Sequence, residues 1–117
     1  MAVKESSTNQ ENRRIINNRC PVTFTLERIG GRWKPLILYN LQASTLRYTQ
    51  LKKSIPGITE KMLIQHLREL EADDLIMRDV KPVVPPHVEY SLTEKGRGLG
   101  ALLNEMAQWG LKNRTTV

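Results

Sequence analysis

The stretch Pro56–Leu75, PGITEKMLIQHLRELEADDL, contains the clearest pattern in this chain and decides its predicted fold. Pro56-Gly57 is a turn signal, and Thr59 is a good N-cap for a helix that begins at Glu60. When residues are placed about 100° apart around a helix, leucines gather on one side and polar side chains on the other. The inward stripe contains Leu63, Leu67 and Leu70, and the opposite face contains Lys61, Gln65, Arg68 and Ala72.

The outward face of this helix offers a cation, an amide and a guanidinium, which are groups that bind phosphates and base edges. Arg68 can grip a guanine and Gln65 an adenine with two hydrogen bonds each. An α-helix also has the diameter to enter a DNA major groove. The competing interpretation is an ordinary amphipathic surface helix whose polar side chains are solvated. The rest of the chain decides between the two.

The chain is short and basic. Its 117 residues suit one domain, and 18 Lys and Arg against 12 Asp and Glu give a net charge of +6. That charge favours a polyanionic partner, nucleic acid first and an anionic membrane surface second. A single cysteine excludes an internal disulfide and suits a reducing cytosol. There is no signal-peptide pattern and no apolar run of the ~18 residues that span a bilayer. We therefore expect a cytoplasmic protein without a membrane partner.

The residues before the Pro56–Leu75 stretch divide into a polar arm and a set of short elements. Residues 1–18 cannot bury enough apolar surface to offset the entropy of ordering, so they are predicted to be a mobile N-terminal arm. A folded domain is predicted over residues 19–114, opening with a helix that starts at Pro21 and stops at Gly30-Gly31. The next predicted elements are a helix over Arg32–Leu41, a strand over Leu46–Tyr48 and a helix over Gln50–Ile55 that Thr49 caps.

After Asp73-Asp74 the spacing of apolar residues changes from helical to extended. Two strands, Leu75–Val80 and Val88–Leu92, are predicted to pair as a hairpin. The proline-rich segment between them, residues 81–87, should project rather than pair, because proline cannot donate to a ladder. A last helix is predicted over Glu94 to about Asn113, and its apolar residues form a broad face.

A short helix, a turn, a longer helix and a two-stranded ribbon follow one another as in a winged helix-turn-helix. We therefore predict an α+β, mainly helical fold: a winged helix-turn-helix with an additional C-terminal dimerisation helix. The recognition helix, about residues 59–73, would enter the major groove, and the wing, about 81–87, would lie on the flanking backbone. The broad apolar face of the last helix needs a partner, so a homodimer on a palindromic operator is predicted. The residues assigned to the dimer interface are Phe24, Trp33, Leu99, Leu102, Leu103, Met106 and Trp109.

The predicted DNA contacts come from three elements. They are Thr49, Lys52 and Lys53 on the bracing helix, Thr59, Lys61, Gln65 and Arg68 on the recognition helix, and Lys81 and His87 in the wing. The alternative function is a winged-helix protein–protein module without sequence-specific DNA binding, with Met62 and Ile64 as contact residues. Salt separates the two, because phosphate-driven binding collapses as salt rises.

Several blocks of the chain are similar to one known family. They are Cys20-Pro21-Val22, GGRWKPLIL at residues 30–38, LRELE at 67–71 and PPHVEYSLTEKG at 85–96. From about Cys20 to Gly110 the chain resembles the HxlR-type winged helix-turn-helix transcriptional regulators. The resemblance implies a prokaryotic homodimeric repressor or activator, in which Cys20 can serve as a redox or electrophile switch. Asp74 stands where the family usually has glycine, and Asp tolerates the left-handed conformation. Gly98 and Gly100 weaken the start of the last helix.

The remaining motifs favour neither catalysis nor a cofactor. GRGLGA at residues 96–101 matches a dinucleotide-binding pattern but lacks the second parallel strand and the acidic residue that the pattern requires. Cys20, His66 and His87 do not have zinc spacing. We therefore expect no enzyme, no cofactor and no metal. Cys20 is either an inert, half-buried small residue or a sensor thiol beside a helix N-terminus. The residues identify neither the operator nor an effector.

Overall fold

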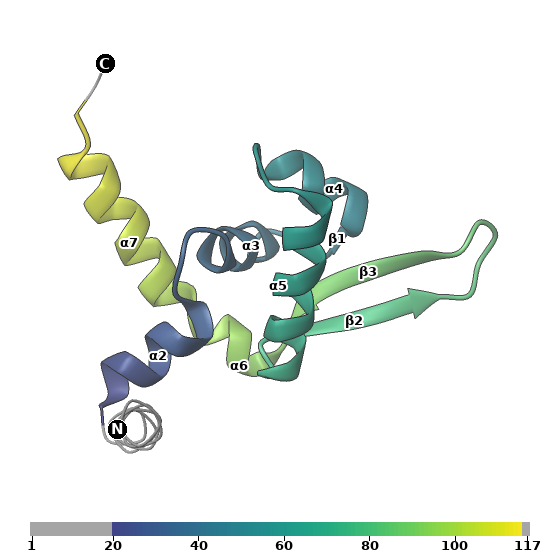
Figure 1. Ribbon diagram of the computed structural model, residues 1–117, viewed down its shortest axis with the longest axis horizontal. Helices are drawn as coiled ribbons and strands as arrows, with labels where there is room; N and C mark the ends of the chain where they lie inside the picture. Colours follow the sequence, from purple (N-terminus) through teal and green to yellow (C-terminus); the bar gives the residue numbers. More distant parts are fainter. Residues whose placement is uncertain (1–19, 116–117) are drawn as a thin grey trace, which may run out of the picture. The chain divides into compact units, whose positions relative to one another are not determined.

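The computed structural model of the chain describes residues 20–115. The chain divides into two units, one ending at Gly31 and the other beginning at Arg32. Figure 1 labels the helices and strands. The mobile arm predicted over residues 1–18 lies outside the described residues. None of the helices in the described range combines the length and the apolar character needed to cross a membrane.

The first unit contains α2, Pro21–Ile29, which begins and ends where the sequence predicts. Pro21 lies in the first turn, where its missing N–H removes no helical hydrogen bond. Cys20 is the N-cap residue and has an extended backbone. Phe24 and Leu26 are exposed, so this short helix carries apolar surface that faces water.

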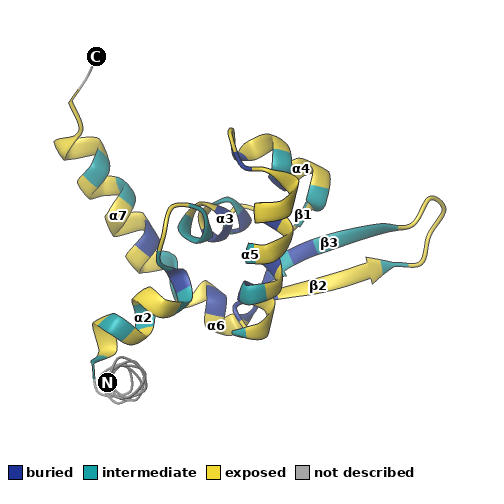
Figure 2. Cartoon of the chain, in the orientation of Figure 1, coloured by how far each residue is buried: buried dark blue, intermediate teal, exposed yellow. Residues whose placement is uncertain are grey.

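The second unit is built around three helices, α3 (Lys34–Leu41), α4 (Tyr48–Ser54) and α5 (Glu60–Ala72). α3 begins after the predicted Arg32, because Pro35 is compatible only with the first turn of a helix. Buried leucines and isoleucines from all three helices form the core of this unit, drawn in dark blue in Figure 2. They include Ile37, Leu38, Leu51, Leu63 and Leu70.

An antiparallel sheet with the strand order β1-β3-β2 completes the second unit. β1 is Leu46–Arg47, β2 is Ile76–Lys81 and β3 is His87–Leu92. Lys81 pairs with His87 at the far end of the hairpin, so the predicted projecting loop over residues 81–87 is too long. Only residues 82–86 form the tip, because the residues on either side of the prolines still have N–H groups for the ladder.

The start of α4 also differs from the prediction. The helix begins at Tyr48, so Thr49 lies inside its first turn and is not the N-cap. The Gln50 side chain instead accepts a hydrogen bond of 2.8 Å from the backbone N–H of Arg47. A Gln three residues into a helix can reach back in this way, and the contact replaces the cap expected from Thr49.

The single last helix predicted from Glu94 onward is two helices, α6 (Glu94–Arg97) and α7 (Gly100–Asn113). The N–H of Leu99 donates to the carbonyl oxygen of Gly96, three residues back, at 3.1 Å, and this tighter turn ends α6. A glycine lies on each side of Leu99. Each glycine lowers helix stability by roughly 1 kcal/mol relative to alanine, which explains why the helix breaks here.

Hydrogen bonds tie the turn after α5 to the start of α6. Asp74 has a φ of 60°, the left-handed conformation predicted for it. The Thr93 hydroxyl donates to the Asp74 carbonyl oxygen at 2.6 Å and accepts from the N–H of Gly96 at 2.9 Å. The N–H of Thr93 donates to the carbonyl oxygen of Leu75 at 3.1 Å. The end of α5, the hairpin and α6 therefore share one hydrogen-bonded cluster.

A substitution at Gly96 tests how tightly this hydrogen-bonded cluster is packed. A methyl group at Gly96 would collide with the carbonyl oxygen of Leu75, so we expect Gly96→Ala to lower the free energy of unfolding by roughly 1–3 kcal/mol. The control is Gly110→Ala in α7, where the added methyl lies within 4 Å of no described heavy atom beyond the adjacent residues and the neighbouring backbone of the same helix. Helix propensity should raise its stability by ~0.5–1 kcal/mol. Urea unfolding followed by circular dichroism measures both, and a Gly96→Ala variant as stable as wild type would contradict the collision.

Candidate nucleic-acid interface

α5 turns its polar side outward because its leucines are buried. The buried stripe consists of Leu63, Leu67 and Leu70. The exposed face includes Lys61, Gln65 and Arg68. The helix begins at Glu60, and the Thr59 hydroxyl caps it by accepting from the N–H of Met62 at 3.1 Å. Both the start of this helix and the side that it buries agree with the sequence prediction.

A shallow hollow of about 410 Å³ lies on the outer side of α5. Its lining brings three of the predicted contact residues together, Lys61, Gln65 and Arg68. Ile64 also lines this hollow and is 40% exposed. Hydrogen-bond donors around a small apolar patch suit the edges of base pairs in a major groove, where thymine adds a methyl group.

A charged contact holds α5 against α3. Lys34 Nζ lies 3.4 Å from Glu69 Oε1, and His66 Nδ1 lies 3.2 Å from the same oxygen. The Lys34 side chain is only 13% exposed, so it depends on Glu69 as a counter-charge. Burial alone would raise the pKa of Glu69, but the charges and hydrogen bonds of Lys34 and His66 hold that pKa below its ordinary value. This contact therefore helps to fix which side of α5 faces water.

The lysines of α4 lie just before the turn that leads into α5. Lys52 and Lys53 occupy the last turn of α4, and Thr49 lies in its first turn. Lys53 and Thr49 are exposed, and Lys52 is half-buried. None of the described carboxylates forms an ion pair with either lysine. Within the described residues, both ammonium groups therefore keep their charge available for phosphate.

The two wing residues predicted to contact DNA already have carboxylate neighbours. Lys81 Nζ lies 2.8 Å from Asp79 Oδ2, and His87 Nε2 lies 2.9 Å from Glu89 Oε2. The hydrogen bond and charge of Asp79 raise the pKa of Lys81. Asp79 therefore reduces the positive charge that the wing brings to a phosphate, and Glu89 engages one ring nitrogen of His87. The tip beyond them is apolar, and Val84 is 99% exposed.

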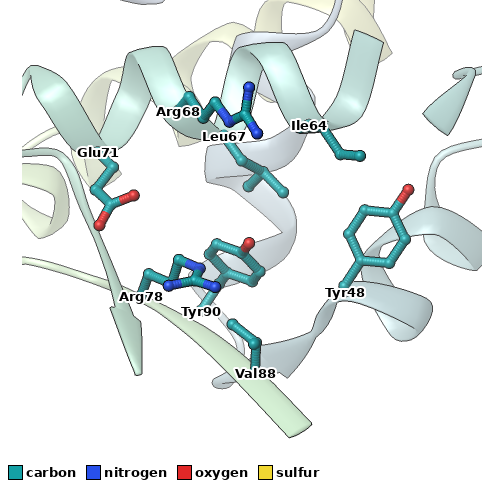
Figure 3. A pocket seen from close by; sticks show the side chains of 8 residues that line it. All are labelled: Tyr48, Ile64, Leu67, Arg68, Glu71, Arg78, Val88 and Tyr90. Atoms are coloured by element: carbon teal, nitrogen blue, oxygen red, sulfur yellow. The ribbon is translucent and has the colours of Figure 1, made fainter. Parts of the chain in front are cut away.

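A cavity of about 470 Å³ lies between α5, the start of α4 and the hairpin. Figure 3 shows side chains of α5 facing those of the two strands across it, with Tyr48 on one side. The facing side chains are Ile64, Leu67 and Arg68 from α5 and Arg78, Val88 and Tyr90 from the strands.

The sequence prediction missed this cavity and missed Arg78. Arg78 pairs with Tyr90 across the hairpin, and directly opposed residues of an antiparallel pair share one face. The position of Arg78 could have been predicted, because side chains two residues apart in a strand lie on the same face and Arg78 follows the buried Ile76 by two residues. That spacing places a guanidinium on the side of the hairpin that faces α5.

Tyr48 contributes an unusual polar atom to the cavity. Its hydroxyl oxygen is buried and has no hydrogen-bond partner among the described residues. Burial raises the pKa of the Tyr48 phenol, and the negative charge of Glu60 adds to the increase. Buried polar atoms nearly always have a partner, so an unpaired hydroxyl at this position is an exception.

Cys20 is half-buried at the N-terminus of α2. Hydrogen bonds from the side chain and the backbone of Thr23 lower the pKa of its thiol, against an opposing effect of burial. A lower pKa increases the fraction of thiolate, which is the reactive form. The described residues contain no cluster of His, Cys, Asp and Glu that could hold a metal ion.

The residues predicted for a dimer interface are not equally exposed. The exposed members are Phe24, Leu102, Met106 and Trp109. The half-buried members are Trp33 and Leu99. Leu103 is buried within the chain, at 3% exposure, whereas Trp109 is 71% exposed. Leu102, Met106 and Trp109 therefore leave an uncovered apolar row along α7.

Comparison with known proteins places this arrangement among transcriptional regulators. The model of the HxlR-like helix-turn-helix family matches residues 28–116. The uncharacterised HTH-type transcriptional regulator YybR of Bacillus subtilis is 45% identical over 106 residues, which cover 89% of this chain and 85% of that protein.

Solved structures of similar proteins have the same fold. The redox regulator HypR in its oxidised form matches with a TM-score of 0.80 and 46% identity, covering 83% of this chain and 100% of that chain. The reduced form of the transcriptional regulator YodB from Bacillus subtilis matches with a TM-score of 0.69 and 38% identity, covering 78% of this chain and 83% of that chain. The predicted winged helix-turn-helix is therefore confirmed.

Replacing Glu69 should make the stability of the protein less sensitive to acid. A depressed carboxyl pKa stabilises the fold above the unfolded value, near 4.5, and this contribution is lost as the pH falls through the folded value. The free energy of unfolding of wild type should therefore fall more than that of Glu69→Gln as the pH falls below about 4.5. Because Glu69 is 44% exposed, the difference should stay below about 1 kcal/mol.

Urea unfolding at several pH values measures this difference. The control is Glu105→Gln, which removes an exposed carboxyl group from α7 and should follow the wild-type pH dependence. Parallel curves for wild type and Glu69→Gln would contradict the role assigned to the contact between Lys34 and Glu69.

Proposed function

We propose that this chain, which belongs to the HxlR-like helix-turn-helix family of transcriptional regulators, binds a two-fold-symmetric site in double-stranded DNA as a homodimer. The chain is a DNA-binding transcriptional regulator, and its family is one of regulators rather than enzymes. The specific contacts, the dimer and the response to oxidants are the proposed part.

The exposed ridge of α5 supports the proposed DNA contacts most directly. Lys61, Gln65 and Arg68 share one hollow on the side opposite the buried leucines. A helix with this arrangement can lie in a major groove, with Arg68 toward guanine and Gln65 toward adenine. We assign these side chains to reading base edges and their immediate flanks.

The neighbouring elements would position α5 through the phosphates. The N-terminus of α5 at Thr59 presents backbone N–H groups to an anion, and Thr49, Lys52 and Lys53 reach phosphates from α4. Lys81 in the wing would contribute less charge, because Asp79 already neutralises part of it, and the ring of His87 is already engaged by Glu89. Phosphate contacts of this kind fix register but do not read sequence.

The homodimer rests on the apolar surface that α7 leaves exposed. Leu102, Met106 and Trp109 lie close to one side of α7 by helical spacing, and Phe24 adds exposed surface on α2. Two subunits joined by a two-fold axis can place their α5 helices about 34 Å apart, one turn of DNA. This spacing would suit a palindromic operator.

Arg68 and Lys53 should affect DNA binding in different ways. Arg68→Ala should weaken operator binding by roughly 1–3 kcal/mol and relax sequence preference, because a base contact is lost. Lys53→Ala should weaken binding to all sequences alike and lower the salt slope by about 1, because a phosphate contact is lost. Fluorescence anisotropy with operator and scrambled duplexes over a salt series measures both effects.

The operator for this experiment comes from sequencing the DNA that is crosslinked to the protein in its source cell. Lys112→Ala in the last turn of α7 is the control, because it removes one positive charge from a helix outside the proposed DNA interface. If Arg68→Ala bound operator as wild type does, the proposed orientation of α5 in the groove would be wrong.

The same salt series tests the alternative of a protein–protein module. Met62 and Ile64 are 37% and 40% exposed, which is the surface that the alternative requires. Binding through phosphates should fall by orders of magnitude between low and moderate salt. Complexes with another protein through apolar contacts should persist, so absence of salt-sensitive duplex binding would favour the module.

Trp109→Ala should convert the dimer toward monomer. Large aromatic residues dominate the energetics of interfaces, and Trp109 is the most exposed of the predicted interface residues. Size-exclusion chromatography with light scattering measures the mass of the particle. Leu111→Ala is the matched control, because Leu111 is an exposed apolar residue on the opposite side of α7. A wild-type protein that elutes as a monomer at all concentrations would contradict the dimer.

Cys20 is proposed as a thiol that senses oxidants. Its support is the lowered thiol pKa at the start of α2 and the similarity to HypR, which is described as a redox regulator. Diamide oxidises two thiols to one disulfide and is itself reduced to the hydrazine, and because each chain has one cysteine, the second thiol is the partner subunit's Cys20 or added glutathione. This treatment should weaken DNA binding by wild type but not by Cys20→Ala. Thr23→Val should slow alkylation of Cys20 at neutral pH, because the hydrogen bond from the Thr23 side chain is removed. Equal diamide responses of wild type and Cys20→Ala would remove this role.

A further inference from the structure

The cavity between α5 and the hairpin contains groups that the proposed DNA contacts do not use. Its volume of about 470 Å³ lies within the range of small-molecule sites, about 300–1,000 Å³. Leu67 and Ile64 from α5 and Val88 from β3 supply apolar surface. Such sites combine an apolar lining with a few convergent polar groups, and this cavity has both.

The charged side chains that line the cavity give it a net positive charge. Arg68 and Glu71 reach it from α5, and Arg78 reaches it from β2 on the other side (Figure 3). Two guanidinium groups and one carboxylate leave a net charge of one positive unit. Among the described residues, neither arginine forms an ion pair within 4.0 Å. Both guanidinium groups therefore keep the paired N–H donors that bind a carboxylate with two hydrogen bonds.

Tyr48 gives an independent indication of a bound group. Its hydroxyl oxygen is buried without a partner among the described residues, and a ligand oxygen in the cavity could supply one. The ring of Tyr90 stands between α5 and the strands in Figure 3. Because an aromatic ring packs well against apolar and aromatic side chains, the occupant that fits these groups is a small aromatic acid.

We propose that this cavity binds one small aromatic carboxylate per subunit, held between Arg68 and Arg78, and that the bound acid displaces DNA. The site itself does not depend on the proposed function, but the displacement does. Arg68 would serve both partners, so a guanidinium engaged by the carboxylate is withdrawn from the base that it would contact. The carboxylate also neutralises the positive charge between α5 and the wing, where a phosphate backbone would lie.

Direct titration in the absence of DNA tests the site. Benzoate and 2-naphthoate are the probes, and their neutral amides are the controls for charge. Isothermal titration calorimetry should show saturable binding of at least one acid with one site per chain. Its amide should bind at least about tenfold more weakly, because a hydrogen bond to a charged group is lost.

Two variants test separately the charged contact from Arg78 and the hydroxyl contact from Tyr48. Arg78→Gln should weaken binding of the acid at least about tenfold, whereas the control Arg114→Gln, at the end of α7, should bind as wild type does. Tyr48→Phe should weaken binding of the acid without lowering the urea midpoint, because the hydroxyl has no partner to lose among the described residues and its removal relieves a buried unpaired group. A midpoint at or above that of wild type excludes misfolding as the cause.

A second arm measures displacement of DNA. Saturating acid should raise the Kd of wild type for operator duplex at constant ionic strength, and the amide should not. Failure of wild type to bind DNA at all would contradict the proposed function while leaving the direct titration valid. The proposal is overturned if neither acid binds, if the amides bind as tightly as the acids, or if Arg78→Gln changes DNA affinity but not acid affinity. The last result would make the cavity part of the DNA interface alone.

Discussion

The burial of three leucines along α5 is the constraint on which the rest of the molecule depends. Each fully buried leucine contributes roughly 1.5–3 kcal/mol relative to an exposed one, and Leu63, Leu67 and Leu70 are almost completely buried. Turning α5 by a single residue, about 100°, would bring these side chains into water. The orientation of the polar ridge is therefore a consequence of the core, and the contact between Lys34 and Glu69 adds to the same restraint.

Sequence patterns predicted the parts of the fold that are decided locally. The N-cap at Thr59 depends on residue types within a few positions of one another, and it is present. The left-handed turn that the family resemblance implies at Asp74 is also present. The cap expected from Thr49 was wrong because the helix begins earlier, at Tyr48, where Gln50 reaches back to the N–H of Arg47. The last helix was predicted as continuous because its apolar spacing continues through Leu99, although the flanking glycines weaken the helix there. Apolar periodicity shows which side of a helix is buried but not where the helix bends.

The part of the candidate site that lies on a single helix could be predicted from the sequence. Periodicity alone placed Lys61, Gln65 and Arg68 on one exposed face. The cavity could not be predicted in the same way, because it exists only where α5, the start of α4 and the hairpin meet. The carboxylate neighbours of Lys81 and His87 were visible at a spacing of two residues, which places side chains on one face of a strand. Their effect on the wing follows only once the strands are known to extend to residues 81 and 87.

The interruption between α6 and α7 has a mechanical consequence. α6 is anchored to the end of α5 and to the hairpin through Thr93 and Gly96, whereas α7 begins anew beyond Leu99. A helix that stops and restarts has no unbroken hydrogen-bond ladder across the gap, so α7 need not continue the direction of α6. The first turn of α7 is held separately, because a methyl group at Gly100 would lie 2.9 Å from the Gln42 side chain and Leu103 is buried. In the proposed dimer, the break would therefore let the apolar row on α7 take its direction from α3 rather than from α6.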